Sequence, residues 1–164
     1  MRVPGISAKG GSNSESGAAL VEMSVVIPVV LAIGLGVIEF GNYFYSYQLL
    51  QSGVRDAARF AASQSYPASS TQITAIKNLA VTGKPAGGNP RVLWWSVADV
   101  SVNYTTVANP KLSTGLSTFR YEGDVPVVTV STSVPYESLG FLGFLGITSL
   151  NLHATHQERV TGER

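Results

Sequence analysis

The stretch Gly17-Ala18-Ala19-Leu20-Val21-Glu22 joins a polar N-terminal segment to an apolar run that continues to Ile38. Glu22 is the only charged residue in that run. A charge at bilayer depth costs roughly 2.5–3.5 kcal/mol on insertion scales, so an acid inside a membrane helix indicates a function. Cutting the peptide bond after Gly17 would give Ala18 a free, positively charged amine about one helical turn from the Glu22 carboxylate. Gly17, Ala18 and Glu22 are therefore candidate site residues.

The apolar run is long enough to cross a bilayer. Residues 23–38 carry no charge, and adding residues 18–22 brings the span to about 21 residues, where a bilayer requires roughly 20. In a secretory signal the small-residue cleavage site follows the apolar stretch, whereas here Gly17 and Ala18 precede it. Cleavage at this point would leave the helix on the mature protein. We therefore expect a leader over residues 1–17 and a transmembrane helix over residues 18–39.

The segments on either side of the span differ in pattern. Residues 1–17 have no periodicity and are expected to be disordered, with the helix beginning near Gly17. Pro28 lacks the N–H that would bond the Ser24 carbonyl, which predicts a local bend or an unwound turn. Beyond the span, apolar residues alternate spacings of three and four, so one long helix should continue as an amphipathic helix over residues 40–63. Its apolar stripe consists of Phe40, Tyr43, Tyr47, Leu50, Val54, Ala57 and Ala61.

The rest of the chain predicts a small α+β domain. After a turn at residues 63–70, Ile73, Ile76 and Leu79 mark a short helix that Gly83 closes. Apolar and polar residues then alternate around residues 100–104, 128–134 and 150–154, with a weaker pattern at 119–121. We expect the helical stripe to pack on an antiparallel sheet of three to four strands, in one extracytoplasmic domain over residues 40–164.

A glycine before the cleavage point, a glutamate at the fifth position after it and an apolar helix together resemble a type IV prepilin. Further motifs resemble the TadE-like family, the pseudopilins of tight-adherence (Flp) pilus systems. The resemblance covers about residues 17–62, and Asn42 and Ala58 depart from the family pattern, which often has a basic residue and a glycine there. The motifs are Pro28, Gly36-Val37-Ile38-Glu39-Phe40-Gly41 and Arg55-Asp56-Ala57-Ala58-Arg59-Phe60-Ala61.

The resemblance implies a minor pseudopilin, matured by a prepilin peptidase that cuts after Gly17. It implies a bacterial inner-membrane protein with a cytoplasmic N-terminus, a periplasmic domain, and other pilins and pseudopilins as partners. Glu22 would be neutralised by an Ala18 amine, its own or a neighbour's. Glu39, at the outer edge of the span, is expected to touch water as a boundary residue, with subunit assembly as its less favoured role. The alternative is an uncleaved single-pass protein that binds a ligand or scaffolds a secretion system, and the N-terminus of the mature protein distinguishes the two.

Composition excludes several other classes of function. A formal charge of +1 with 13% charged residues, scattered along the chain, gives no basic patch for nucleic acid. The absence of cysteine excludes disulfides, thiolate metal ligands and cysteine nucleophiles. His153 and His156 are three apart on an expected strand, so they point to opposite faces and cannot hold one metal together. No Gly-x-Ser-x-Gly or His-Glu-x-x-His motif occurs. We expect no catalytic residue, no metal, no cofactor and no small-molecule substrate.

Two apolar features remain open. Of the adjacent Trp94 and Trp95, one should pack inward while the other lies at the surface. The repeat Gly140-Phe141-Leu142-Gly143-Phe144-Leu145-Gly146 is an apolar loop between two expected strands. We favour a lid that closes the open end of the core, and the alternative is an exposed interaction site.

Overall fold

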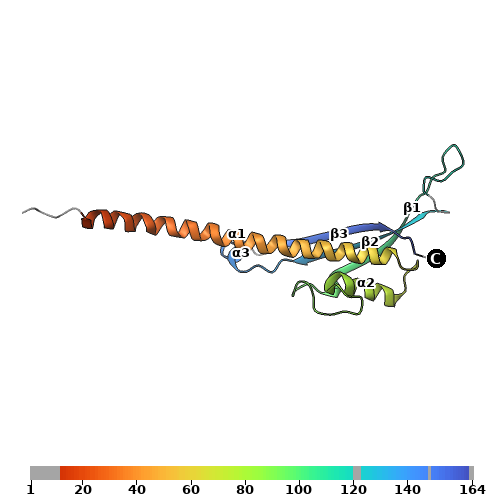
Figure 1. Cartoon of the computed structure of the whole chain (residues 1–164), viewed down its shortest axis with the longest axis horizontal. Coiled ribbons are helices and arrows are strands. Elements are labelled where there is room, and N and C mark those ends of the chain that lie inside the picture. Colours follow the sequence, from red (N-terminus) through yellow and green to blue (C-terminus); the bar gives the residue numbers. More distant parts are fainter. Residues whose placement is uncertain (1–11, 120–122, 148, 163–164) are drawn as a thin grey trace, which may run out of the picture.

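The structure is a computed structural model of the full chain, and it describes residues 12–119, 123–147 and 149–162. Figure 1 shows the helix α1 as a long rod whose second half carries all the other elements. The predicted class, an α+β domain with a long N-terminal helix on a small antiparallel sheet, is confirmed. In chain order the elements are α1 Ser12–Ala62, α2 Ser70–Thr82, the 3-10 turn η1 Val97–Asp99, β1 Val100–Val107, β2 Val125–Pro135, α3 Phe141–Phe144 and β3 Asn151–Arg159.

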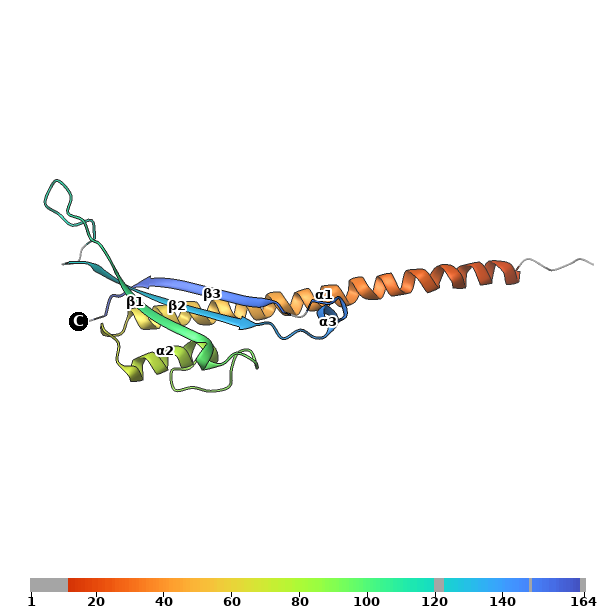
Figure 2. The same ribbon diagram turned by 180° about the vertical axis from the view of Figure 1, so that it is seen from behind.

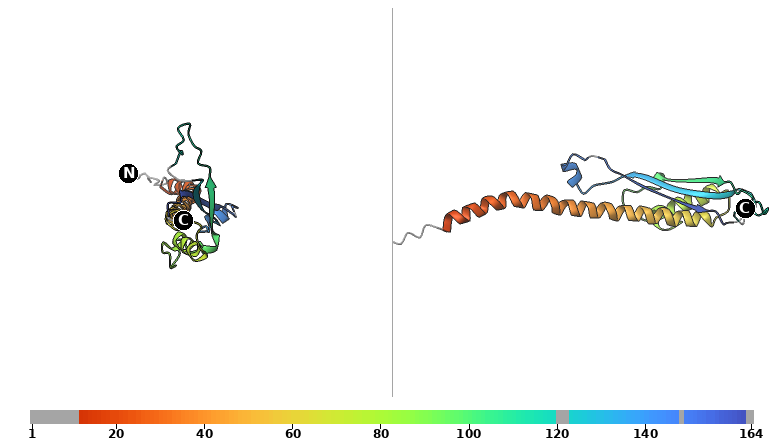
Figure 3. Two further views of the ribbon diagram at one scale, coloured as in Figure 1. Left: turned by 90° about the vertical axis from the view of Figure 1, so that its right-hand side faces the viewer. Right: turned by 90° about the horizontal axis from the view of Figure 1, so that it is seen from above.

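The helix α1 begins earlier and is more regular than the sequence predicts. It starts at Ser12, so the expected start near Gly17 is wrong, because extending a formed helix costs little compared with nucleating one. The disorder predicted for residues 1–17 is wrong for residues 12–17, which are helical, and residues 1–11 lie outside the described residues. The helix also runs through Pro28 without an unwound turn, although its N-terminal half curves gently (Figure 3).

The three strands form a sheet in the order β1-β2-β3, with both pairs antiparallel. Thr132 in the central strand pairs with Val100 on one side and Ala154 on the other, and all three side chains are buried. Side chains alternate between the two faces of a strand, and the register places the alternating positions of residues 100–104, 128–134 and 152–154 on one face of the sheet; Leu150 lies just before β3. Of the weaker segment at 119–121, only Phe119 is described, and it lies in a bend outside the three strands.

One face of the sheet packs on the two long helices, with α1 against β2 and β3 and α2 near β1 (Figure 2). Of the predicted stripe, Leu50, Val54, Ala57 and Ala61 are fully buried, and Tyr43 and Tyr47 are half-buried against the same core.

Phe40, expected in this stripe, is instead 62% exposed, and its neighbour Glu39 is 2% exposed. The buried side of α1 thus follows Glu39, Tyr43, Ser46 and Leu50, spaced by four, three and four residues. Hydrophobicity alone predicts that Phe40 lies on the buried face of α1. Glu39 is buried there instead, because it forms the hydrogen bonds described below.

The two long helices meet closely at Gly53. A Cβ at this position would collide with the backbone carbonyl oxygen of Ala80 in α2 and lie 2.8 Å from Cη2 of Trp95. Trp95 is 2% exposed and donates its indole N–H to the Thr132 hydroxyl over 3.0 Å. Trp94 is only half-buried and meets the Tyr136 ring edge-on, so the predicted division of the tryptophan pair is confirmed.

The C-terminal ends of α1 and α2 are both capped by backbone hydrogen bonds. The helix α2 closes at Gly83, as predicted, with φ of 76°. At the end of the chain, the backbone N–H groups of Thr161 and Gly162 donate to the Ala62 carbonyl over 2.7 and 3.1 Å. The last described residues therefore cap the C-terminal end of α1.

The apolar loop between β2 and β3, which we define as residues 139–147, does not act as the predicted lid. Only Leu142 packs against the core, while Phe144 is 84% exposed and Leu145 is 55% exposed. The reason is its place in the fold: the loop carries α3 beyond the sheet and alongside α1 (Figure 3).

Candidate functional site

The first half of α1 is an apolar surface without a partner inside the chain. From Leu20 to Ile38 its large apolar side chains are between 45% and 72% exposed. The helix is long and apolar enough to cross a membrane, and its most apolar window is not buried in the protein at all. A bilayer would remove this surface from water.

The candidate processing residues lie near the exposed start of this surface. Gly17, Ala18 and Glu22 are all exposed, and a Cβ at Gly17 would meet no atom within 4 Å. Ala18 and Glu22 are four residues apart in one continuous helix, so they lie on the same face, one turn apart. The roles of these three residues in cleavage and assembly stay predictions.

Glu39 occupies the buried end of the stripe, and the expectation that it touches water is wrong. Its Oε1 accepts hydrogen bonds from the Tyr136 hydroxyl at 2.9 Å and from the Leu139 backbone N–H at 3.0 Å. Asn42 Nδ2 donates to the same Tyr136 hydroxyl over 2.7 Å. We call Glu39, Asn42, Tyr136 and Leu139 the Glu39 clamp. It ties the start of the apolar loop to α1.

The clamp leaves one polar atom unused. Glu39 Oε2 is buried and has no hydrogen-bond partner among the described residues. Burial raises the pKa of the Tyr136 phenol above its ordinary value of 10.0; the Asn42 amide opposes the rise, and Glu39 adds to it. The Tyr136 hydroxyl therefore stays protonated and remains the donor to Glu39.

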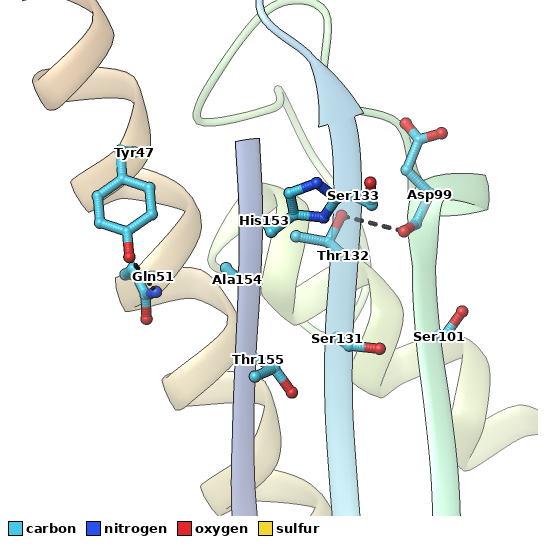
Figure 4. A pocket seen from close by; sticks show the side chains of 10 residues that line it. All are labelled: Tyr47, Gln51, Asp99, Ser101, Ser131, Thr132, Ser133, His153, Ala154 and Thr155. Atoms are coloured by element: carbon cyan, nitrogen blue, oxygen red, sulfur yellow. Dashed lines mark hydrogen bonds between the residues drawn. The ribbon is translucent and has the colours of Figure 1, made fainter. Parts of the chain in front are cut away.

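A polar groove crosses the sheet between β1, β3 and α1 (Figure 4). Some of its groups are paired locally: the Thr132 hydroxyl donates to the Asp99 carbonyl at 3.0 Å, and Gln51 donates to the Tyr47 hydroxyl at 2.9 Å. The Asp99 carboxylate accepts from the Ser96 N–H at 2.9 Å rather than orienting His153. The groove residues therefore supply hydroxyls and one imidazole. Among the described residues they do not place a nucleophile, a base and an orienting acid in contact with one another.

The two histidines lie on opposite faces of β3, as their spacing predicts. His153 is exposed, whereas His156 is half-buried with Nε2 3.0 Å from Glu158 Oε1. Within the described ranges, no group of three or more His, Asp or Glu residues lies close enough to hold a metal ion.

Fold and surface together define a class of protein, an α+β domain built on the second half of a helix whose first half can cross a membrane. Residues 17–59 match the family of TadE-like proteins, which confirms the resemblance over that segment. Over these residues alone, the match indicates similarity to membrane proteins associated with the Tad pilus, a structural rather than an enzymatic family. Neither curated proteins nor solved structures give a significant match to the chain.

Sequence reasoning missed most of the clamp and the close approach at Gly53. Tyr136 and Leu139 are 97 and 100 residues from Glu39, so no local pattern links them. The signal for Gly53 was present: Gly53, Ala57 and Ala61 repeat a small residue every four positions, which favours close packing along one face of a helix.

Proposed function

We propose that the protein is a minor pseudopilin, a structural subunit in the assembly of a tight-adherence pilus. One observation carries this proposal: a Gly-Ala junction with a glutamate five residues after the glycine lies at the exposed start of a membrane-length helix that continues as the spine of its own domain. The family match over residues 17–59 supports it. The chain itself catalyses no reaction in this role, and its partners are the prepilin peptidase and other pilins.

The mechanism follows from the two halves of α1. The second half is packed in the domain, and the apolar first half remains available to lipid or to the helices of neighbouring subunits. After cleavage, the Ala18 amine and the Glu22 carboxylate compensate each other's charge in apolar surroundings, within a subunit or between neighbours. We place the protein in the bacterial inner membrane, with its N-terminus in the cytoplasm and residues 40–164 in the periplasm.

Processing is tested with Gly17→Val, in cells that contain the peptidase. Because a small side chain lets the backbone approach closely in a narrow protease cleft, the variant should remain full-length. The measurement is the mass and N-terminal sequence of the membrane-extracted protein. Gly34→Val is the matched control, since a Cβ at Gly34 also meets no atom within 4 Å, and it should be shortened normally. Normal shortening of Gly17→Val would refute this site, and an uncleaved parent protein would support the uncleaved anchor.

Assembly is tested with Glu22→Gln. The amide loses the charge-assisted bond to the Ala18 amine, a defect of about 1.5–3 kcal/mol per contact, so crosslinked oligomers and surface pili should be lost. Insertion and cleavage should survive, because Gln is no costlier to insert than Glu. Glu15→Gln is the control, because Glu15 is removed with the leader. Wild-type amounts of mature protein, oligomers and pili in Glu22→Gln would remove Glu22 from the mechanism.

A further inference from the structure

The apolar loop, residues 139–147, has no polar or charged side chain at any of its positions. Leu139, Phe144, Leu145 and Ile147 are between 42% and 84% exposed. In water such a surface is unfavourable, and a contiguous exposed apolar patch marks an interaction site. Its position along α1 identifies what covers it.

The loop lies beside the membrane half of α1. A Cβ at Gly36 would be 3.5 Å from Phe141 Cε1, so the two segments are in close contact. Phe141 and Phe144 line an apolar groove together with residues of α1. The helix side of this groove consists of Pro28, Leu31, Ala32, Leu35, Ile38 and Glu39.

Helix geometry places this contact inside the bilayer. A hydrocarbon core of about 30 Å takes about 20 helical residues, so a span that begins at Ala18 ends near residue 37. Gly36 therefore lies within the outer edge of the core. Aromatic side chains gather at membrane–water interfaces, and α1 carries three exposed ones directly after this point. They are Phe40, Phe44 and Tyr45.

The backbone of the loop is adapted to surroundings without water. The Leu139 N–H donates to Glu39, and the N–H groups of Phe144, Leu145, Gly146 and Ile147 all donate to carbonyls within the loop. A segment exposed to lipid must satisfy its backbone groups internally, because each unsatisfied group costs several kcal/mol there. Exposed apolar side chains on a loop in which these five N–H groups are bonded within the chain favour lipid over water as the solvent.

We propose that the apolar loop inserts into the outer edge of the bilayer that α1 crosses, with lipid acyl chains filling the groove between the loop and residues 28–38. The Glu39 clamp fixes the loop to α1 at this depth. The domain is thereby held to the membrane at two points and in one orientation, before any neighbouring subunit binds. This inference rests on the proposed membrane anchoring of α1.

The test measures the depth of single labelled positions in the full-length chain. The chain contains no cysteine, so Phe144→Cys can be labelled alone with an environment-sensitive fluorophore. Two further variants give references: Val30→Cys for the anchor, and Leu116→Cys for a side chain that is 69% exposed. Leu116 belongs to the segment between β1 and β2 that projects at the opposite end of the domain (Figures 1 and 2).

Each labelled protein is reconstituted in phosphatidylethanolamine–phosphatidylglycerol vesicles, at low protein density. We expect the label at residue 144 to be quenched by a spin label attached to lipid near the headgroup, and several-fold less by aqueous iodide than the label at residue 116. The label at residue 30 should respond to a quencher deep in the acyl chains.

The outcomes separate the inference from the function on which it rests. If iodide quenches the label at residue 144 as strongly as the label at residue 116, while the label at residue 30 lies in lipid, the loop does not insert. The proposed membrane anchoring of α1 is then still supported. If residue 30 is also in water, both the anchoring and the inference fail. If residue 144 is protected only at high protein density, a second copy of the chain covers the loop, and the lipid proposal is overturned.

Discussion

Replacing Gly53 with alanine is expected to lower the free energy of unfolding by about 3 kcal/mol, at the upper end of what overpacking costs. The added Cβ would meet the Ala80 carbonyl oxygen and two atoms of the Trp95 ring. Because the nearest atom belongs to the backbone of α2, a change of side-chain rotamer cannot make room. The helices must separate, and the packing around Trp95 is lost with them.

This effect is measured by urea unfolding of the full chain in detergent micelles, followed by tryptophan fluorescence. Trp94 and Trp95 are the only tryptophans, and both lie in the domain, so the signal reports its unfolding. Gly41→Ala is the matched control, since a Cβ there meets no atom within 4 Å, and it should be neutral or stabilising by up to about 1 kcal/mol. Equal stability of Gly53→Ala and the parent would show that α1 and α2 do not meet closely.

The second large effect is expected for Tyr136→Phe, which should destabilise the domain by about 2 kcal/mol. The change removes the donor to Glu39 Oε1 and the acceptor for Asn42, while the aromatic ring stays in place. Glu39 Oε2 has no partner in the described structure, so the buried carboxyl would retain only the Leu139 N–H. A buried acceptor that loses its donor carries the desolvation cost without compensation.

Tyr104→Phe makes the same chemical change at a site where it should cost nothing. The Tyr104 hydroxyl oxygen is buried and has no hydrogen-bond partner among the described residues, so its removal should leave stability unchanged or slightly higher. Both variants are compared in the same unfolding assay. Equal losses in the two variants would mean that the clamp contributes nothing specific.

The Tyr136 variant also changes the response to alkaline pH. Because burial raises the pKa of Tyr136 in the folded protein, its contribution is fully present below the ordinary value of 10.0 and is lost as the pH rises through the higher folded value. Burial raises the pKa of Tyr104 as well, so the parent loses stability from both. Tyr136→Phe should therefore lose less stability between about pH 8 and pH 11 than the parent does. A parallel decline of the two would contradict the raised pKa.

The parts of this fold that the sequence predicts are those with local physical signals. The apolar run after Glu22 predicts the membrane helix, alternating valines in residues 128–134 predict the central strand, and Gly83 predicts the end of α2. The burial of Glu39 was not predictable in this way, because its partners follow a strand and a loop that lie far along the chain. Its charge predicts that Glu39 is exposed to water. Only the folded structure shows the hydrogen bonds that allow its side chain to be buried.

The residues of the candidate site also differ in whether a local sequence pattern predicts them. Gly17, Ala18 and Glu22 form a motif within six residues, so the sequence alone identifies them. The depth of the apolar loop depends on how β2 and β3 are placed on α1, so hydrophobicity revealed the loop without revealing what it contacts. A lid and an exposed interaction site have the same local pattern, and the contact of Phe141 with Gly36 shows that the loop lies along α1.

The order of the elements along the chain determines when the domain can close. Among the described elements, β3 packs on α1, pairs with β2 and is synthesised last, and residues 161–162 after it cap α1, which is synthesised first. Contacts between the two ends of a chain form late, because the intervening segment must first be ordered. The domain therefore cannot close until β3 and residues 161–162 have been synthesised and released. Until then the buried stripe of α1 is uncovered, and the incompletely folded chain is prone to aggregation.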